Sequence, residues 1–404
     1  MMKPPLRHYK ILFVLTPAFI PNAGGVQMST AKMGRHFAEH GHQVAVFSLQ
    51  KEGHQSCSFG RLFASPALGG SGNSANLEAL ERCVQDFAPD IVINQMPYEF
   101  AVGEVLKANK RYLLLGCLRN TLYSVKSNLE SYVKRTAPGA LKHLSRNKSV
   151  QNMFLQIHRI RHRAELKKIL ETYDLFVMFG PPNLEELGYF IPNFDPGKIK
   201  LIPNSIPSVA TTVPQKEKRI LWLGRIVEHQ KRAELILPVW QRVSHALPDW
   251  ELDVVGDGPL LEELKRRVRQ LGLERVQFHG RQIPDEFYRR AATFFMTSAF
   301  EGFPNTLVEA QSHAAIPVVF DSYPVAKWIV EDGQNGHLVD PFDVDAMAER
   351  IISLANLPER QRFAQKSLES AHRFHIERVG QMWQELFNAE VPLHVKPPES
   401  QSAA

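Results

Sequence analysis

The sequence predicts an α/β protein built from two doubly wound domains that face each other across a cleft. Three observations predict this fold. The chain has 404 residues, more than one ordinary hydrophobic core accommodates. Short apolar segments alternate with amphipathic ones along its whole length, as in parallel sheets. A polar segment with two prolines at 207–218 interrupts this alternation and is predicted to be the linker between domains at 1–206 and 219–372.

The first half opens with a predicted buried strand at residues 11–15. An Asn-Ala-Gly-Gly turn at 22–25 leads into a predicted helix at 26–40, which Gly41 ends because glycine tolerates positive φ. The next strand is predicted at 44–49. Further strands are expected at 90–94, 112–117, 175–179 and 199–202.

The second half repeats the pattern from a predicted strand at 219–223. Later strands are expected at 252–255, 276–279, 293–296 and 316–320. The last helical segment is predicted at 360–389 and is long, with a C-terminal helix at 373–390 that can pack back on the N-terminal domain. Residues 391–404 are predicted to be a disordered tail.

Composition places the chain among globular proteins of a reducing compartment. Apolar residues make up 44% and charged residues 22% of it. Its three cysteines, Cys57, Cys83 and Cys117, form no C-x-x-C motif and are interpreted as small buried residues. The apolar run at 11–15 is short and soon followed by prolines, so it is interpreted as a strand and not as a cleaved signal peptide. We therefore expect a cytoplasmic protein.

The formal net charge of +6 is unevenly distributed. Between Lys107 and Lys168 basic residues are frequent, apolar residues are interleaved, and Glu130 and Glu165 are the only acids. This pattern suits an anionic membrane surface or a phosphate-bearing acceptor. A solvated helical face that happens to be basic explains it equally well. Nucleic acid is not expected, because no nucleic-acid motif accompanies the charge.

The segment 297–319 is the most informative part of the sequence. Glu301 and Glu309 flank a Gly-Phe-Pro-Asn-Thr turn that leads into a predicted helix. Free backbone N–H groups and the positive end of the helix dipole suit a phosphate. Carboxylates accept hydrogen bonds from sugar hydroxyls. The combination predicts a site for a nucleotide sugar.

Two further loops carry groups suited to phosphate. Gly24 and Gly25 lack Cβ atoms, so the backbone there can approach a ligand closely. Arg225 and Lys231 follow the predicted strand at 219–223 and can converge on a diphosphate. Each pair also has a structural explanation, a plain turn for the glycines and solvated surface cations for the other two. The neighbouring motifs favour the functional interpretation.

Two other motifs are interpreted as structural. The Gly-Asp-Gly-Pro turn at 256–259 lacks the third glycine of a dinucleotide fingerprint, so a strand-to-helix turn is a sufficient explanation and a backbone contact to the nucleotide a second option. Asp343 and Asp345 have the spacing of a metal-binding pair, but they directly precede a predicted helix and are expected to cap it. We therefore expect no metal and no cofactor.

Together these motifs, in this order, resemble the family-4 retaining glycosyltransferases of the GT-B fold, also described as glycosyl transferases group 1. The resemblance is strongest from 219 to 341, and the Glu-x7-Glu pattern with EGFPN inside it is its most specific part. The residues that carry it are Gly24, Gly25, the segments 41–44 and 203–204, Gly224, Arg225, Lys231, the segments 256–259 and 278–280, Glu301 to Asn305, Glu309, Ala310 and the segment 317–319.

The resemblance implies specific roles, in a reaction that retains the configuration of the sugar and needs no metal. The residues implied in catalysis are Glu301, Arg225 and Lys231. Arg225 and Lys231 would bind the donor diphosphate, Glu309 the ribose, and Glu301 the transferred sugar. The implied donor-binding residues are Gly24, Gly25, Arg225, Lys231, Gly256, Glu301, Gly302, Phe303, Pro304, Asn305, Thr306, Leu307 and Glu309.

The sequence departs from the family pattern on the acceptor side. Family members often carry a histidine near the end of the strand predicted at 90–94, whereas this chain has Asn94 and Gln95. We assign Gln95, Arg119 and Asn120 to the acceptor side. The segment 313–317 is one residue longer than the family pattern, which affects local helix–strand packing more than the chemistry.

The sequence thus predicts a glycosyltransferase that acts on a glycan or lipid-linked acceptor in polysaccharide or lipopolysaccharide biosynthesis, peripheral to the inner membrane face. Two alternatives stay open. One is a nucleotide-sugar epimerase on the same fold, and the other is a non-catalytic sugar- or membrane-binding protein. The intact Arg225, Lys231, Glu301 and Glu309 argue against the second.

Overall fold

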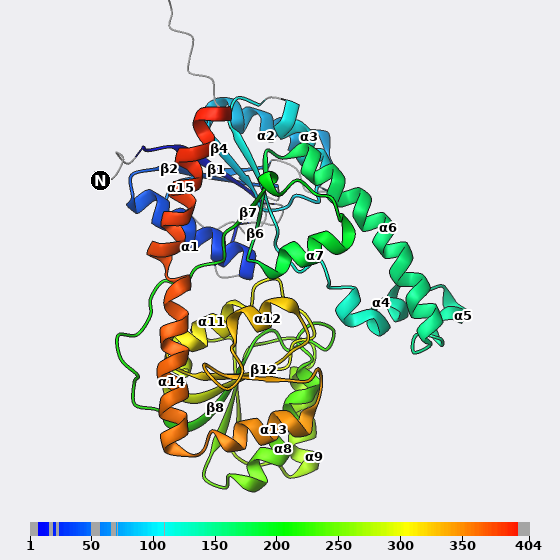
Figure 1. Cartoon of the computed structure of the whole chain (residues 1–404), viewed down its shortest axis with the longest axis vertical. Coiled ribbons are helices and arrows are strands. Elements are labelled where there is room, and N and C mark those ends of the chain that lie inside the picture. The colour runs from blue at the N-terminus through cyan, green and yellow to red at the C-terminus, as the bar shows by residue number, and fades with distance from the viewer. Residues whose placement is uncertain are drawn as a thin grey trace, which may run out of the picture.

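The structure is a computed structural model that describes residues 7–15, 19–21, 24–49, 57–65, 70, 72–108 and 110–394. Figure 1 shows two layered bodies stacked along the long axis, each with a central sheet between helices. The upper body holds the N-terminal half of the chain and the final helix. The lower body holds the C-terminal half. The predicted α/β fold class is therefore confirmed.

Within the described residues, the N-terminal sheet has seven strands in the order β3-β2-β1-β4-β5-β6-β7, and all its pairings are parallel. The strand order reverses between β1 and β4, where doubly wound sheets open a crevice at the strands' carboxyl ends. The strands are β1 (Lys10–Leu15), β2 (Gln43–Ser48), β3 (Arg61–Ala64), β4 (Ile91–Asn94), β5 (Leu113–Cys117), β6 (Leu175–Met178) and β7 (Ile199–Leu201). The helices are α1 (Gly25–Glu39), α2 (Ser74–Phe87), α3 (Phe100–Ala108), α4 (Leu129–Thr136), α5 (Gly139–Lys142), α6 (Lys148–Thr172) and α7 (Pro182–Phe190).

The C-terminal sheet has six strands in the described part of the chain, in the order β10-β9-β8-β11-β12-β13, and is also parallel. Its order reverses between β8 and β11. The strands are β8 (Glu217–Leu223), β9 (Glu251–Val255), β10 (Val276–Gly280), β11 (Ala291–Met296), β12 (Ile316–Phe320) and β13 (His337–Val339). The helices are α8 (Ile236–Ala246), α9 (Leu261–Leu271), α10 (Asp285–Arg290), α11 (Asn305–Ser312), α12 (Pro324–Ile329), α13 (Val344–Ser353) and α14 (Leu357–Ala371).

The central strands are buried on both faces, which explains their uninterrupted apolar sequences. In β1, Ile11 and Phe13 belong to the core beneath α1, whereas Leu12 and Val14 belong to the core on the opposite face. Strands β3 and β13 were not predicted from the sequence. Both are short strands at sheet edges, and β3 is half-exposed, so neither carries a strong apolar run.

The helical segment predicted at 360–389 is interrupted, close to the start of the C-terminal helix predicted at 373–390. Helix α14 ends at Ala371, a short 3-10 turn spans His372–Phe374, and α15 (Ile376–His394) then begins. The break has a physical cause, because Ile206 pairs with the turn. Its N–H donates to Phe374 O (2.9 Å), and its carbonyl accepts from Ile376 N (2.9 Å). These bonds join the two points where the chain crosses between the bodies.

Helix α15 lies against α1 and β5 in the upper body (Figure 1). Val379, Trp383 and Phe387 are buried there in one core with Phe13 and Phe37. The predicted disorder of the tail is wrong for residues 391–394, since α15 extends to His394. The remainder of that predicted tail lies outside the described residues.

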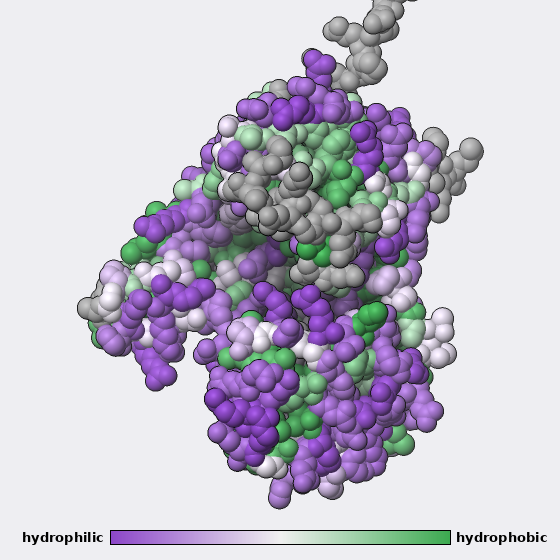
Figure 2. Space-filling view, turned by 180° about the vertical axis from the view of Figure 1, so that it is seen from behind, coloured by the Kyte–Doolittle hydropathy of each residue, from purple (hydrophilic) through white to green (hydrophobic). Residues whose placement is uncertain are grey.

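Helices α4, α5 and α6 project beside the domains as an arm (Figure 1). Seen from behind, the arm is mainly hydrophilic, and the surface is hollowed between it and the lower body (Figure 2). Among the described helices, none combines the length and the apolar character needed to cross a membrane.

Candidate active site

The two bodies meet where the turn before α1 faces the loop before α11. Gly24 has φ 153°, a conformation that residues with a Cβ rarely adopt. A Cβ added to Gly25 would lie 3.3 Å from Asn305 Nδ2. Asn204 also bridges the bodies, because its Nδ2 donates to Asn305 Oδ1 (3.1 Å). The structure thus brings Gly24, Gly25 and Asn305 together. Residues 22–23 of the same turn lie outside the described part.

Glu301 and Lys231 form an ion pair at the carboxyl edge of the C-terminal sheet. Lys231 Nζ lies 2.7 Å from Glu301 Oε1, and both side chains are largely buried, with 13% and 8% exposure. Gln230 Nε2 donates to Glu301 Oε2 (3.3 Å). Arg225 is more exposed and donates through Nη2 to Gln230 Oε1 (2.9 Å). Arg225, Lys231 and Glu301 are therefore brought together, with Gln230 as a link that the sequence analysis missed.

A buried hydrogen-bond chain holds Lys231 in place. Trp222 on β8 donates through Nε1 to Thr297 Oγ1 (3.0 Å), and Thr297 donates in turn to Lys231 O (2.7 Å). Thr297 directly follows β11, so the loop after β8 is tied to the loop that carries Glu301. Buried polar networks of this kind, once fully satisfied, specify one geometry. The chain therefore fixes the backbone of Lys231, whose side chain is paired with Glu301.

Glu309 on α11 is contacted from both bodies. Tyr288 Oη donates to Glu309 Oε2 (3.1 Å). Burial, reinforced by the Glu309 carboxylate, raises the pKa of Tyr288 well above its ordinary value, so the phenol keeps its proton. Lys32 on α1 reaches across the cleft and places its Nζ 2.8 Å from Glu309 Oε1. Neither Lys32 nor Tyr288 stands in a motif, and only proximity in the fold identifies them.

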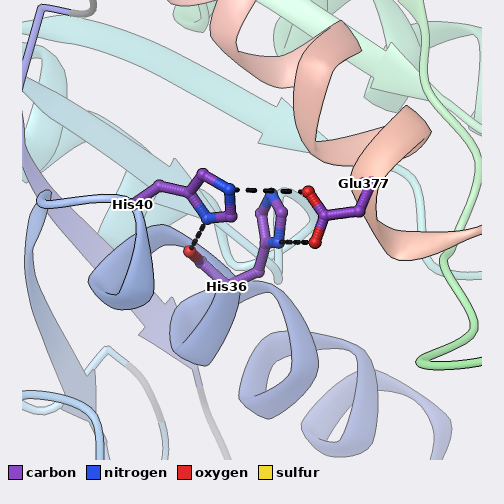
Figure 3. Close-up of side chains that lie close together, drawn as sticks. All are labelled: His36, His40 and Glu377. Atoms are coloured by element: carbon purple, nitrogen blue, oxygen red, sulfur yellow. Dashed lines mark hydrogen bonds and ion pairs between the residues drawn. The ribbon is translucent and has the colours of Figure 1, made fainter.

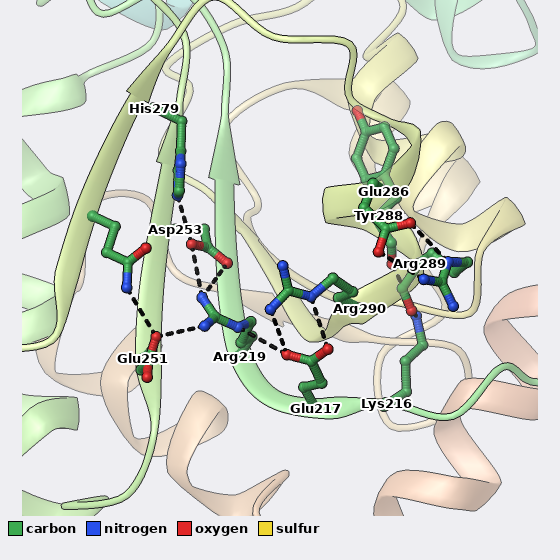
Figure 4. Close-up of polar contacts among 11 residues, drawn as sticks. Lys216, Glu217, Arg219, Glu251, Asp253, His279, Glu286, Tyr288, Arg289 and Arg290 are labelled. Carbon is green, nitrogen blue, oxygen red and sulfur yellow. Dashed lines mark hydrogen bonds and ion pairs between the residues drawn. The ribbon is translucent and has the colours of Figure 1, made fainter.

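Helix α10, which supplies Tyr288, is fastened to the sheet by charged side chains (Figure 4). Lys216 Nζ donates to three carbonyls, those of Tyr288 (2.9 Å), Arg289 (3.1 Å) and His313 (2.6 Å). Burial lowers the pKa of Lys216 to about 7. Arg290 donates twice to Glu217, at 2.7 and 2.8 Å. Because Glu217 and Lys218 belong to β8, the last two residues of the predicted linker are part of the sheet.

The loop before α11 is packed tightly against the N-terminal domain. A Cβ on Gly302 would lie 2.7 Å from Asn120 Cα, so only glycine fits. Phe303 is buried against Phe179 and Phe374, with ring centroids 5.7 and 5.4 Å apart. This explains why a large aromatic residue follows a glycine here. The loop is a contact between the domains as well as part of the candidate site.

The predicted phosphate cradle is only partly available in this structure. Asn305 N donates to Phe303 O (3.0 Å) and Leu307 N to Pro304 O (3.0 Å), so both amides already have acceptors. Pro304 has no N–H to offer. Thr306 differs, because its Oγ1 is buried without a hydrogen-bond partner among the described residues. Within this loop the Thr306 hydroxyl is the group that most needs a ligand.

The glycines of the 256–259 turn serve packing between loops. Cβ atoms on Gly256 and Gly258 would lie 1.8 Å from Gly224 O and 2.4 Å from Ile226 O, respectively. Both residues also have positive φ, at 142° and 159°. The structural interpretation of this turn is therefore sufficient, and a contact from Gly256 to the nucleotide stays a prediction. Asp343 caps α13 by accepting from Ala346 N (2.9 Å), as expected.

Gln95 follows β4 and Arg119 follows β5, and both line one pocket beneath α1. Asn120 has an exposed side chain, and its backbone lies close to Gly302. Gln95 is 2% exposed, and its Oε1 has no partner among the described residues. Arg119 Nη1 donates to Asn204 Oδ1 (3.3 Å), but its Nε is buried without a described partner. Burial lowers the pKa of Arg119, although the neighbouring Cys117 thiol opposes this. Asn94 instead bonds Tyr173 Oη (2.6 Å) inside the domain and is structural.

Residues 208–369 match the model of the family described as Glycosyl transferases group 1. The matched segment contains Arg225, Lys231, Glu301 and Glu309. The match covers most of the C-terminal domain, which is therefore similar to the group 1 glycosyl transferases. The resemblance stated from the sequence is thereby confirmed at the level of this group.

Curated relatives match this chain over part of their own length. The chain is 29% identical over 184 residues to an uncharacterized glycosyltransferase of Haemophilus influenzae, covering 45% of this chain and 52% of the relative. It is 26% identical over 229 residues to the amylovoran biosynthesis glycosyltransferase AmsD of Erwinia amylovora, covering 56% and 62%. It is 31% identical over 152 residues to lipopolysaccharide 1,6-galactosyltransferase of Salmonella typhimurium, covering 35% and 42%. The chain thus spans about half the length of these relatives.

Solved structures match over nearly the whole chain. The apo form of the lipopolysaccharide outer core galactosyltransferase WaaB aligns with a TM-score of 0.68 at 18% identity, covering 94% of this chain and 99% of that one. A TarM mutant from S. aureus in complex with fondaparinux, alpha-GlcNAc-glycerol and UDP aligns with a TM-score of 0.72 at 14% identity, covering 94% and 100%. These likenesses show that the group 1 domain is the second half of a GT-B fold.

Proposed function

We propose that this protein is a retaining, metal-independent family-4 glycosyltransferase that moves a sugar from a nucleoside-diphosphate sugar to a glycan or lipid-linked acceptor. The observation that carries the proposal is the Lys231–Glu301 ion pair next to Arg225, on the same sheet edge as the α11 helix with Glu309. Cations for a diphosphate and carboxylates for hydroxyls then stand on one wall of the cleft. The group 1 domain supports the assignment independently.

In this proposal each charged residue has a separate task. Arg225 and Lys231 stabilise the negative charge that develops on the departing diphosphate. Glu309 accepts hydrogen bonds from the ribose hydroxyls, which requires Lys32 to give way or to share the carboxylate. Glu301 accepts from hydroxyls of the transferred sugar. The buried Thr306 hydroxyl donates to a phosphate oxygen.

The reaction balances without a strong protein base. The bond between the anomeric carbon and the diphosphate oxygen breaks, and the electron pair stays on the diphosphate. The acceptor hydroxyl oxygen bonds to the same face of the anomeric carbon. Its proton passes to the departing diphosphate, whose oxygen is the nearest base. The configuration of the sugar is thereby retained.

The acceptor would enter from the N-terminal wall. Gln95 and Arg119 line the pocket there, and their unpartnered polar atoms suit an acceptor that brings hydroxyl or anionic groups. Relatives named for lipopolysaccharide and amylovoran biosynthesis support an acceptor of the cell-surface polysaccharide type. We also propose that the protein works at the cytoplasmic face of the inner membrane.

The projecting arm supports that location. Met153, Ile157 and Ile160 on α6 are exposed by 46%, 41% and 71%, between lysines and arginines of the same helix. An apolar row among cations favours an anionic bilayer surface. Flotation of the protein with vesicles that contain anionic lipid, and with neutral vesicles as the control, tests this part separately.

The site assignment is tested by donor binding. Saturation-transfer NMR across a panel of nucleotide sugars identifies the donor, and Glu309→Gln is then compared with Glu349→Gln, an exposed glutamate on α13. We expect donor affinity to fall about 10-fold or more in the first variant, because charge-assisted hydrogen bonds contribute roughly 1.5–3 kcal/mol. The control should bind as the wild type does.

Full donor binding by Glu309→Gln would overturn the ribose assignment. The fate of the donor distinguishes the alternatives. Sugar transferred with retained configuration supports the proposal. Conversion of the donor without any acceptor indicates an epimerase, and binding without any turnover indicates a non-catalytic sugar-binding protein.

A further inference from the structure

Helix α1 and helix α15 bring two histidines and a glutamate together at the junction of the N-terminal domain and the C-terminal helix (Figure 3). His36 and His40 are four residues apart, so they lie on one face of α1. Glu377 lies in the first turn of α15. Glu377 is far from the histidines along the chain, so the cluster could not be predicted from spacing in the sequence.

The nitrogen atoms of the two histidines lie close to the two carboxylate oxygens of Glu377. His36 Nδ1 lies 3.7 Å from Glu377 Oε1, and His40 Nε2 lies 3.5 Å from Glu377 Oε2. One ligand atom from each of the three residues lies within 4.8 Å of the others. In a tetrahedral zinc site with bonds of about 2.0–2.2 Å, neighbouring ligand atoms are roughly 3.3–3.5 Å apart. The distances from His36 and His40 to the Glu377 carboxylate are therefore within a few tenths of an ångström of that spacing.

The orientation of His40 is fixed by its own helix. Its Nδ1 lies 2.8 Å from the carbonyl oxygen of His36. A carbonyl oxygen only accepts, so Nδ1 donates to it, and Nε2 is the ring nitrogen that faces the Glu377 carboxylate and is placed to bind a cation. A backbone carbonyl that holds the second ring nitrogen is the usual arrangement around histidine ligands of metals.

The ring of His36 packs against Gly380 of α15, a residue without a side chain. A Cβ on Gly380 of α15 would lie only 1.9 Å from His36 Nε2, so the ring fills the space that the glycine leaves. His36 is 7% exposed, whereas the side chains of His40 and Glu377 are 40% and 60% exposed. The site therefore has one buried wall and one open side, where a water molecule can complete four-coordination.

We propose that His36, His40 and Glu377 form a zinc site that fastens α15 to α1. Two imidazoles and a carboxylate are a ligand set that zinc accepts readily, and the fourth position would be held by water. The role of the ion would be structural. On α1, Lys32 lies one turn before His36 and faces Glu309, so the ion would hold the helix that carries one of the contacts between the domains. The site is separate from the glycosyl-transfer residues.

The test uses the full-length chain without an affinity tag, freed of metal with a chelator and titrated with zinc chloride by calorimetry. We expect one zinc ion per chain, a rise in melting temperature on zinc addition, and the visible absorption of a tetrahedral complex when cobalt(II) replaces zinc. His40→Gln and Glu377→Gln change exposed residues and leave the fold intact, which circular dichroism checks. Each should weaken zinc binding at least 10-fold and abolish the rise in melting temperature.

His143→Gln is the matched control, because His143 is an exposed histidine on the arm. It should bind zinc as the wild type does. Zinc affinity that is equal in the wild type and in His40→Gln would overturn the proposal, since it would come from scattered surface histidines. Absence of zinc binding in the wild type would overturn it as well.

Discussion

The two walls of the cleft satisfy their polar groups differently. On the C-terminal wall, Lys231 is paired with Glu301, and Glu309 is held by Lys32 and Tyr288. On the N-terminal wall, Gln95 Oε1 and Arg119 Nε are buried without partners among the described residues. The charged groups of the C-terminal wall are therefore paired, although the Thr306 hydroxyl there is buried without a described partner, whereas the N-terminal wall carries an unpartnered amide oxygen and an unpartnered guanidinium N–H.

The difference has an energetic meaning. A buried polar atom without a partner costs about 1–3 kcal/mol, which a ligand or a water molecule can recover. A buried charge that is paired has little free-energy cost as long as its partner is present. A ligand that binds such a charge must replace an existing contact. The C-terminal wall is built to hold a geometry, and the N-terminal wall to receive hydrogen bonds. Four substitutions test whether the two walls differ in this way.

Lys231→Met should have the largest effect. It removes a cation from the proposed diphosphate site, so we expect kcat to fall about 10²–10³-fold. It also leaves Glu301 buried without its counter-charge, which should lower the free energy of unfolding by roughly 3–5 kcal/mol. Steady-state kinetics and urea unfolding measure the two effects.

The double variant Lys231→Met with Glu301→Gln separates stability from activity. Stability should largely return, because no unpaired carboxylate is left, while activity should stay low. Lys366→Met is the control, since it breaks an exposed ion pair with Glu369 and should cost less than about 1 kcal/mol. A return of activity in the double variant would contradict a role for Lys231 in charge stabilisation.

Gly302→Ala should have the next largest effect. The new Cβ would lie 2.7 Å from Asn120 Cα, and backbone does not yield as a side chain does. The two walls should then be held apart, and transfer should fall about 10-fold or more, because small misplacements of reacting groups are costly. Donor binding to the C-terminal wall should be retained.

Gly139→Ala is the matched control, because a Cβ there meets no atom within 4 Å. Transfer rates and donor affinity of both variants are measured side by side. Unchanged transfer by Gly302→Ala would show that this close approach of the domains is not needed in the reacting state.

Lys32→Met tests whether the pairing of Glu309 across the cleft competes with the donor. The carboxylate would keep the Tyr288 hydrogen bond but lose the ion pair. We expect the donor to bind a few-fold more tightly, since it no longer displaces a cation. Isothermal titration with the donor measures this, and Arg35→Met on the exposed face of α1 is the control. Weaker donor binding would instead mean that Lys32 itself contacts the donor.

Gln95→Ala should have the smallest effect and should act on the other wall. It removes an unpartnered oxygen from the pocket beneath α1. We expect KM for the acceptor to rise a few-fold while the dissociation constant of the donor is unchanged. A change in donor affinity of the same size would place Gln95 on the donor side.

The alternation of strands and helices and the motif around Glu301 and Glu309 could be predicted from the sequence. Both are local patterns, since a buried strand needs a run of apolar side chains and a phosphate-binding turn needs neighbouring residues. Prediction from the sequence failed where the decisive contact is remote. The break between α14 and α15 depends on hydrogen bonds from Ile206, and no feature of 360–389 alone announces it.

The contacts of each site residue could be found only from the tertiary structure. Lys32 and Glu309 are 277 residues apart in the chain but 2.8 Å apart in space. The same holds for Gly302 against Asn120 and for Glu377 beside His36. Periodicity and spacing report only on neighbours along the chain, whereas the packing of one domain on another decides which side chains meet. The grouping of Arg225, Lys231 and Glu301 could therefore be predicted from the sequence, whereas the contacts across the cleft could not.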